Sequence, residues 1–441
     1  MLAVMLLAFT SCDSAEEIDP EPENTAEVSA ETNTEAADDY TFDSSETTIV
    51  LNGTSIAVTG DGVTVAGAVA TITQAGTYSV SGTLSNGQLI INAATTDKVK
   101  IKLNGASIVS ASSAPFYAVS ADKVILYLPP GKVNTFTDAS ANALDGALYS
   151  APKLSVFGTG SLTVTGNADG GIVSASGLII KDGAYTVTAA ESPIKSDKNI
   201  IIDGGTFTLA AGNDGIHGEE ALTFNGGNVL ITRSEEGVES SNITINSGAS
   251  IQLTSTDDGL NASSGDDLSN NHFYMNGGYL YINASGDGID SNGYIDMAGG
   301  VVVVNGPAAN GNAAIDYDRT FNITGGLLVA VGSSGMAQAP STTSTQKSVK
   351  VNFSSTKQAN QLVHVQDSNG NNLLTFSPAK SYQSFVFSSP SLATGSSYSV
   401  YVGGSSTGTP TNGLYENGTY TAGTLSTNFT VSSMVTTLAG N

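Results

Sequence analysis

The sequence predicts an all-β protein: a right-handed parallel β-helix with about 22 residues per coil, plus a small C-terminal antiparallel β domain. Three observations predict this fold. Glycine makes up 50 of the 441 residues and charged residues only 12%, a composition that suits short strands and tight turns. Pairs of glycines followed by alternating apolar residues recur with a spacing of 22 residues in the middle of the chain. After residue 336 this period stops and a different strand pattern begins.

Residues 1–12 are predicted to be the remnant of a signal peptide. The apolar run MLAVMLLAFT has the length of a signal core, is too short to cross a bilayer, and precedes the only cysteine, Cys12. Small residues before this cysteine resemble a bacterial lipoprotein cleavage site. We therefore expect a lipid anchor on Cys12, a location at the outer surface of the cell envelope or in the periplasm, and a translation start upstream of the recorded one. The alternative is an ordinary buried cysteine.

Residues 13–46 are predicted to form a disordered acidic tether. They carry 13 acidic residues and no basic one, and they contain too few apolar residues to build a core. The net charge of the whole chain is −25, and the remaining 27 acidic and 15 basic residues still leave −12 without this segment. Because no basic face is evident in the sequence, we expect no nucleic acid partner and no membrane contact other than the lipid anchor. We also expect a monomer.

Residues 47–336 are predicted to form the parallel β-helix. Apolar residues follow two and four positions after the second glycine of each pair, and a third apolar column shares the same spacing. The third column contains Ile194, Ile216, Val238, Leu260, Ile289 and Ile315. Alternate residues of a strand point to opposite faces, so each strand has one buried face. A single coil cannot bury that face alone, and stacked coils must supply the core.

Residues 347–441 are predicted to form the small C-terminal β domain. The stretch AQAPSTTSTQ at 337–346 has the composition of a linker, and it is followed by short runs of alternating apolar residues. The segments QLVHVQ and NNLLTF, joined by DSNG, predict a hairpin. A domain in this place would cover the open end of the β-helix, which otherwise exposes unpaired backbone groups.

Acidic residues recur at one corner of the predicted coils. They stand two residues before the third apolar column and one residue after it, so equivalent carboxylates of neighbouring coils should lie about 4.8 Å apart. Such carboxylates must have raised pKa values, lie in full solvent or bind cations, and Ca²⁺ fits best because it takes roughly six to eight oxygen ligands. The candidate calcium ligands are Asp214, Glu236, Glu239, Asp257, Asp258, Asp287, Asp290 and Asp316. The alternative is that the Asp-Gly and Glu-Gly pairs are ordinary turn dipeptides.

Three tyrosines are candidates for binding carbohydrate. Tyr279 and Tyr281 flank the inward-pointing Leu280, so both should point outward, and Tyr274 lies on a neighbouring strand. Tyrosine rings stack on the faces of sugars and keep a hydroxyl group for hydrogen bonding. The alternative is ordinary packing between neighbouring strands.

No motif for a catalytic nucleophile is visible in the sequence. A lyase that acts on uronates would need a basic residue beside bound calcium, and Arg233 and Lys195 are the candidates near the acidic corner. A transition metal is disfavoured, because the three histidines are far apart in register and the predicted fold contains no cysteine.

Four stretches resemble a family of bacterial carbohydrate-binding parallel β-helix proteins that was formerly a domain of unknown function. They are GVTVAGAVATITQAGTYSVSGTLSNGQLIINA, VKIKLNGASIVSASSAPFYAVSADKVILYLPPGKVNTFTD, ALYSAPKLSVFGTGSLTVTGNADGGI and NDGIHGEEALTFNGGNVLIT. This family is similar in fold to the calcium-dependent family 9 pectate lyases. The resemblance implies a surface protein that binds calcium and acidic or cellulosic plant polysaccharide without cleaving it.

The resemblance places calcium at the corner where the pattern DG-I recurs. The residues that match it are Asp214, Glu236, Glu239, Asp258, Asp287 and Asp290. The coil at 191–194, which reads ESPI, departs from the pattern. Two alternatives to the binding function remain: a calcium-dependent uronan lyase, and a surface adhesin with structural calcium.

Overall fold

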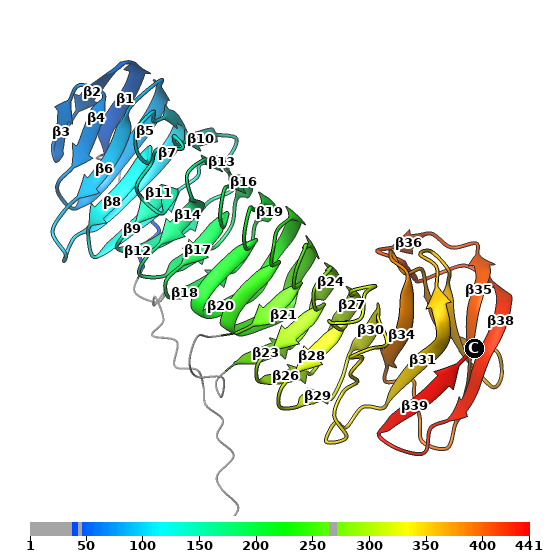
Figure 1. Ribbon diagram of the computed structural model, residues 1–441. Coiled ribbons are helices and arrows are strands. Elements are labelled where there is room, and N and C mark those ends of the chain that lie inside the picture. Colours follow the sequence, from blue (N-terminus) through cyan, green and yellow to red (C-terminus); the bar gives the residue numbers. More distant parts are fainter. Residues whose placement is uncertain (1–37, 43–45, 264–270) are drawn as a thin grey trace, which may run out of the picture.

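The computed structural model describes residues 38–42, 46–263 and 271–441. In these ranges every regular element is a β-strand, and no helix is long and apolar enough to cross a membrane. The strands form an elongated stack of coils with a second β domain at its C-terminal end (Figure 1). The predicted fold class is confirmed. The predicted signal remnant, Cys12 and most of the predicted tether lie outside the described residues.

Each complete coil contributes one strand to each of three parallel sheets, which we call faces 1, 2 and 3. In one coil these strands are β14 (Gly170–Ser174), β15 (Leu178–Ile180) and β16 (Ala184–Ala189). The next coil supplies β17 (Ile194–Ser196), β18 (Asn199–Ile202) and β19 (Thr206–Ala210). Strands of the two coils pair in parallel, and paired residues are 22 positions apart, as the sequence predicts.

The three faces extend along the β-helix. Besides the strands named above, face 1 contains β4 (Val69–Ile72), β6 (Gln88–Asn92), β8 (Phe116–Ser120), β11 (Gly146–Ser150), β22 (Leu260–Ala262), β25 (Ile289–Ser291) and β28 (Ile315–Tyr317). Face 2 contains β9 (Lys123–Tyr127), β12 (Lys153–Phe157), β23 (His272–Met275), β26 (Tyr294–Met297) and β29 (Phe321–Ile323). Face 3 contains β10 (Val133–Thr137), β13 (Ser161–Gly166), β24 (Tyr279–Asn283), β27 (Val301–Asn305) and β30 (Leu327–Gly332).

Four long strands continue from one face into the next. The strands β5 (Gly76–Leu84) and β7 (Lys98–Val109) pass through faces 2 and 3, and they pair with each other in parallel. The strands β20 (Ile216–Arg233) and β21 (Val238–Thr254) pass through all three faces. These strands therefore keep neighbouring faces in a fixed relation.

Apolar side chains of alternate residues fill the inside of the coils. Ile194, Ile216 and Val238 stack in register and are fully buried. The rings of Tyr185 and Phe207 stack on neighbouring coils with their centroids 4.8 Å apart. The second glycine of each pair has a left-handed backbone, as at Gly205 with a φ of 102°, which explains why glycine recurs at this turn.

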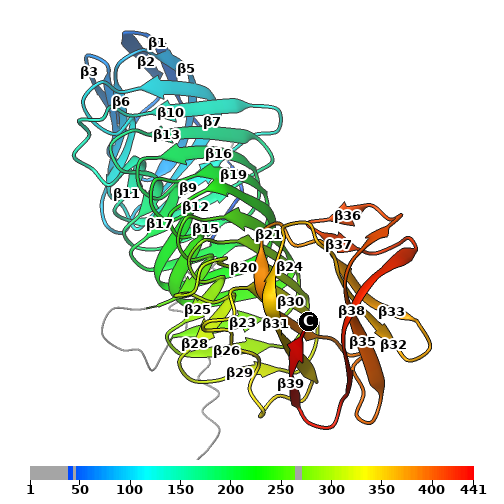
Figure 2. The same ribbon diagram turned by 45° about the vertical axis from the view of Figure 1, so that its right-hand side comes forward.

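Antiparallel strands cover both ends of the β-helix. At the N-terminal end, β1 (Thr47–Gly53) pairs with β2 (Ser55–Thr59), and β3 (Val63–Ala66) pairs with β4. At the other end, β30 pairs antiparallel with β34 (Tyr382–Ser388) of the C-terminal domain. This domain lies beside the last coils (Figure 2). Because an exposed strand edge can pair with another chain, these additions protect the β-helix from association.

The C-terminal domain consists of two sheets that pack face to face. In the first sheet β31 (Ser348–Lys357) pairs with β34 and β39 (Val435–Gly440). The second sheet contains β32 (Val363–Asp367), β33 (Asn372–Phe376), β35 (Ser397–Ser406), β36 (Pro410–Thr411), β37 (Leu414–Tyr415) and β38 (Tyr420–Thr430). Its hydrophobic core includes Val303 and Val329, which point outward from face 3. The domain therefore packs directly on the last coils.

Candidate functional site

The predicted columns of acidic residues meet at one corner, where the chain enters face 1. The backbone amides of Gly215, Gly237 and Gly259 donate to the carbonyls of Glu236, Asp258 and Asp287, at 2.9, 2.9 and 2.8 Å. The second column is also in register, and its members are Glu239, Asn261, Asp290 and Asp316. We call this region the acidic corner. Its side chains fall into two clusters.

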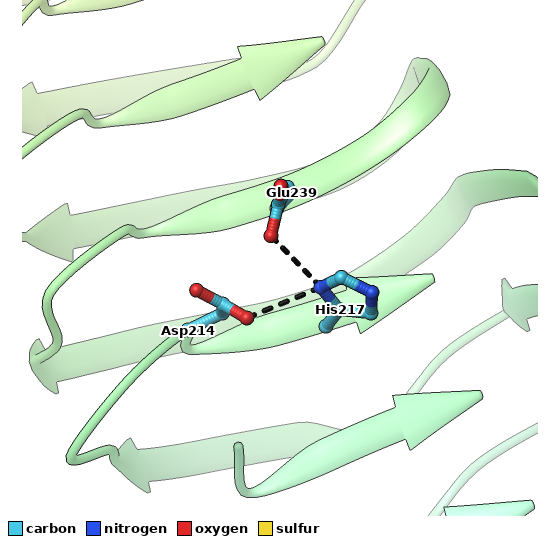
Figure 3. A group of neighbouring side chains, drawn as sticks. All are labelled: Asp214, His217 and Glu239. Atoms are coloured by element: carbon cyan, nitrogen blue, oxygen red, sulfur yellow. Dashed lines mark hydrogen bonds and ion pairs between the residues drawn. The ribbon is translucent and has the colours of Figure 1, made fainter. Parts of the chain in front are cut away.

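The first cluster, which we call the histidine cluster, consists of Asp214, His217 and Glu239 (Figure 3). Nδ1 of His217 lies 3.1 Å from Oδ2 of Asp214 and 2.9 Å from Oε2 of Glu239 on the next coil. Burial disfavours a charged imidazole, but the hydrogen bonds to the two carboxylates outweigh it and raise the pKa of His217 to about 10. The imidazolium therefore supplies the positive charge between these carboxylates at neutral pH.

Glu236 lies between the two clusters. Nδ2 of Asn261 donates to its Oε2 over 3.0 Å. Burial, together with the charges of the neighbouring carboxylates, raises the pKa of Glu236 to about 8. The other amide atom of this asparagine, Oδ1, is buried and has no hydrogen-bond partner. A buried oxygen without a donor is unfavourable, and it indicates a missing partner at this point of the corner.

The second cluster, which we call the carboxylate cluster, consists of Asp258, Asp287 and Asp290. One oxygen of each side chain lies within 4.8 Å of the others. The amide of Asp287 donates to Oδ1 of Asp258 over 2.6 Å, and the amide of Ala313 donates to Asp287. Burial raises the pKa of Asp258 and of Asp287 to about 6, and that of Asp290 to about 7.

The donor atoms of the carboxylate cluster suit Ca²⁺. Asp257 and Asp258 converge over Gly286, where a side-chain Cβ would collide with an oxygen of each. Asn261, with its unpartnered Oδ1, lies in the same column as Asp290 on the adjacent coil. These donors are all oxygens, as calcium prefers. In the histidine cluster Nδ1 of His217 lies between the carboxylates of Asp214 and Glu239, so this group would offer a nitrogen ligand beside two carboxylates.

The structure thus separates the eight residues predicted as calcium ligands. Asp214 and Glu239 lie in the histidine cluster and are bridged by His217, while Glu236 accepts from Asn261. Asp258, Asp287 and Asp290 form the carboxylate cluster, with Asp257 exposed at its edge. Asp316 follows Asp290 in the column, and its Oδ1 accepts a hydrogen bond from the side-chain Nε2 of Gln338.

The three tyrosines predicted to bind carbohydrate lie on two different faces. Tyr279 and Tyr281 are on face 3, and they are half-buried rather than exposed because the C-terminal domain lies over them. Oη of Tyr279 accepts a hydrogen bond from Nδ2 of Asn412 over 3.0 Å. Tyr274 is on face 2, where its ring stacks on His272 with 3.7 Å between the centroids.

A cleft of about 390 Å³ lies between face 3 and the C-terminal domain, and we call it the junction cleft. Tyr279, Val301 and Leu327 line it from face 3. Tyr415 and Glu416 line it from the C-terminal domain. This combination of aromatic, aliphatic and carboxylate groups is chemically suited to a sugar ring. No sequence pattern indicated Tyr415, because it is far from Tyr279 along the chain.

The two basic residues considered for a lyase lie on the coils beside the histidine cluster. Nη1 of Arg233 donates to the carbonyl of Ala211 over 3.0 Å, so the guanidinium group has a structural partner. Lys195 precedes His217 in the same column. The structure adds Lys380 of the C-terminal domain, whose Nζ donates to the carbonyl of Ala284 and whose pKa is lowered to about 8 by burial.

The fold and the corner together define a parallel β-helix protein with an oxygen-rich cluster of carboxylates and a cleft whose lining is suited to sugars. The family model described as carbohydrate-binding domain-containing protein matches residues 66–233 and 210–368. These matches span well over half of the chain, which therefore belongs to this family.

Two individual proteins are similar to parts of the chain. A carbohydrate-binding domain-containing protein of Acetivibrio thermocellus is 35% identical over 126 residues, which are 27% of this chain and 44% of the relative. The match thus spans less than half the length of that curated relative. A gadolinium derivative of the polysaccharide lyase-like protein from C. thermocellum is 24% identical, with a TM-score of 0.45, over 64% of this chain and 97% of that one.

Proposed function

We propose that this protein binds calcium and an acidic or cellulosic polysaccharide of plant type at the cell envelope, and that it does not cleave the polysaccharide. Membership of the carbohydrate-binding family is the observation that carries the proposal. The relative from Acetivibrio thermocellus has the same description, which supports it. A lipid on Cys12 would hold the protein at the envelope.

The calcium part of the proposal rests on the carboxylate cluster. Asp258, Asp287 and Asp290 would hold the ion, with Asn261 supplying an amide oxygen. Bound calcium would supply positive charge at a corner that otherwise repels anions. The carboxylates of a uronate chain could then approach this corner. The neighbouring carboxylate of Asp316 would repel any further negative charge.

The junction cleft is the proposed contact for neutral sugar rings. Tyr279 and Tyr415 would offer ring faces from opposite walls, and the hydroxyl and carboxylate groups beside them would accept or donate hydrogen bonds. This contact does not need calcium. A polysaccharide with both acidic and neutral segments could therefore use both places.

We propose that the polysaccharide is not cleaved because no described residue is a clear candidate for the base beside bound calcium. Arg233 is held by the carbonyl of Ala211, and Lys380 is held by the carbonyl of Ala284. In the described residues, no hydrogen bond or ion pair joins either basic side chain to the carboxylate cluster. A lyase must take a proton from the carbon next to the uronate carboxylate, and geometry decides that step.

A glycan array, with calcium and with chelator, tests this function. Calcium should strengthen the binding of polygalacturonate, and this gain should be lost in Asp290→Asn, while the exposed Asp122→Asn serves as the matched control. Absorbance of the unsaturated uronate product, followed in the same samples, should stay flat. Formation of that product by the wild type, and its loss in Arg233→Ala, Lys195→Ala or Lys380→Ala, would show that the protein is a lyase and contradict binding without cleavage. Calcium binding without any glycan binding would favour an adhesin with structural calcium.

A further inference from the structure

Lysines gather on face 2 of the β-helix although the chain carries a net charge of −25. Six of the 15 basic residues lie in β7, β9 and β12 or directly after β15. They are Lys98, Lys100, Lys102, Lys123, Lys153 and Lys181. We call this surface the lysine face. No basic face is evident in the sequence, but the fold brings these lysines together on one surface.

The lysine face has two columns that follow the coils. Lys98, Lys123 and Lys153 are direct partners in the parallel ladder. A second column, in which Lys102 pairs with Tyr127 and Tyr127 with Phe157, runs beside it. Neighbours in a column lie about 4.8 Å apart, a distance at which like charges repel unless anions lie between them.

A short acidic segment of the same chain lies on this surface, and we call it the covering segment (Asp38–Phe42 with Glu46). Asp38 forms ion pairs with Lys98, at 3.9 Å, and with Lys123. The Asp39 carboxylate lies 2.6 Å from Lys100, and the Glu46 carboxylate lies 2.6 Å from Lys102. These residues were predicted to belong to a disordered tether, but their carboxylates are held by the lysines.

Aromatic rings add a second kind of contact. Tyr127 and Phe157 stack on each other with 4.8 Å between their centroids. Phe42 packs against both rings, and Tyr40 packs edge-on against Phe157 at 4.9 Å. The lysine face therefore offers ammonium groups beside flat rings, and the covering segment uses both.

The contact between segment and face is buried at its centre, whereas Asp39 at its margin is exposed. The side chains of Asp38 and Lys123 are 2% and 4% exposed. Ile125 points outward from β9, yet it is fully buried and does not belong to the inner core. The described part of the covering segment contains no strand. It is thus held by side chains and not by the backbone ladder, so a ligand with similar groups can replace it without breaking a sheet.

We propose that the lysine face is a binding site for a polysaccharide that carries carboxylates, and that the covering segment occupies this site until such a ligand displaces it. Carboxylates would replace those of Asp38, Asp39 and Glu46, and sugar rings would replace Phe42 and Tyr40 on the aromatic pair. The site lies on face 2, whereas the acidic corner opens face 1, so binding here does not need calcium.

The choice of a polysaccharide over an acidic peptide rests on the proposed function. All six lysines fall within residues 66–233, which match the carbohydrate-binding family, and the covering segment precedes that match. An acidic peptide and a nucleic acid are the other polyanions that the lysines could attract, and the test includes both.

The test uses the full chain with EDTA, so that calcium at the acidic corner plays no part. The variant Asp38→Asn/Asp39→Asn/Glu46→Gln should bind polygalacturonate at least tenfold more tightly than the wild type. Adding Lys100→Gln and Lys102→Gln should abolish that gain, while adding Lys132→Gln, which lies outside the face, should leave it intact. An unchanged affinity in the triple variant would overturn the proposal and leave the segment as a structural strap. Tighter binding of polyglutamate or single-stranded DNA than of polygalacturonate would overturn the choice of ligand.

A second measurement does not depend on releasing the segment by mutation. The chain contains no tryptophan, so Phe42→Trp introduces a single fluorescent reporter at the contact. Saturating polygalacturonate in EDTA should shift its emission to the red as the indole enters water, and neutral cello-oligosaccharide should not. No shift at saturation would contradict displacement. Loss of calcium-dependent binding with this shift retained would refute the calcium site and not the lysine face.

Discussion

The imidazole of His217 and the carboxylate of Glu239 meet across two adjacent coils, with 2.9 Å between Nδ1 and Oε2. The same nitrogen faces Asp214 of its own coil. A protonated imidazole at this place puts a positive charge between two stacked carboxylates. It also makes the corner sensitive to pH.

Replacing His217 with Gln should destabilise the protein more at neutral pH than at pH 10. The folded-state pKa of about 10 lies above the ordinary value of 6.5, so the stabilisation is complete below about pH 6.5 and disappears as the pH rises through 10. We expect a loss of about 1.5–3 kcal/mol at pH 7, as for other hydrogen bonds to charged groups. Chemical denaturation at pH 7 and pH 10 measures it.

The control for this substitution is Glu219→Gln, because Glu219 is exposed and lies 3.5 Å from Nε2 of His217. It should change stability far less. An equal loss at both pH values for His217→Gln would show that the imidazole contributes by packing and not by charge.

Without calcium, the stability of the protein should fall as the pH rises from 4 to 8. Burial raises the folded-state pKa values of Asp258, Asp287 and Asp290 to about 6, 6 and 7. In the unfolded chain these groups ionise near pH 4, so in this window the folded state binds more protons and stability falls as pH rises. Thermal unfolding in EDTA should show a decrease of several degrees from pH 5 to pH 7.5.

Calcium should reverse this trend, since it binds the ionised carboxylates of the folded state and stabilises that state. Asp290→Asn should flatten the pH dependence in EDTA and remove the effect of calcium, whereas Asp122→Asn should alter neither. A melting temperature that changes with neither calcium nor chelator at pH 7.5 would rule out a tightly bound ion.

The regular part of the fold could be predicted because its period is visible in the chain. Coils of 22 residues place Asp214 and Glu236 in one column before any coordinates are known. The lysine face could not be found in this way, since Lys98, Lys123 and Lys153 are separated by 25 and 30 residues. Coils of unequal length hide a column from any search for a fixed spacing. That Tyr279 and Tyr415 line one cleft could not be predicted for another reason, because it depends on how the C-terminal domain docks.

Inward and outward positions of face 3 should differ sharply in their tolerance of mutation. Ile231 is fully buried, whereas Thr208 on the neighbouring strand of the same face is exposed. Ile231→Ala should cost about 2–5 kcal/mol through lost burial and the cavity that remains, and Thr208→Ala should cost under about 0.5 kcal/mol. Ile231→Asp should prevent folding, because it buries a charge without a partner.

Gln252 is not a neutral control for that comparison, although it points outward as Thr208 does. Its Oε1 accepts a hydrogen bond from Nδ2 of Asn412 over 3.1 Å, so it holds the C-terminal domain. Similar unfolding midpoints for the alanine variants of Ile231 and Thr208 would mean that the register is wrong.

Neutral sugars should bind at the junction cleft through the rings of Tyr279 and Tyr415. An aromatic stacking contact contributes about 0.5–1.5 kcal/mol, so each alanine variant should weaken binding of a cello-oligosaccharide by about 2–13-fold. Tyr279→Phe keeps the ring and should lose less, which separates stacking from the hydroxyl group that Asn412 contacts.

Tyr294→Ala is the matched control, since this tyrosine is exposed on face 2 and away from the cleft. Titration calorimetry in EDTA measures all four proteins without interference from the acidic corner. A loss in Tyr294→Ala as large as that in Tyr279→Ala would move neutral sugar binding from the cleft to face 2, where Tyr274 and His272 also stack.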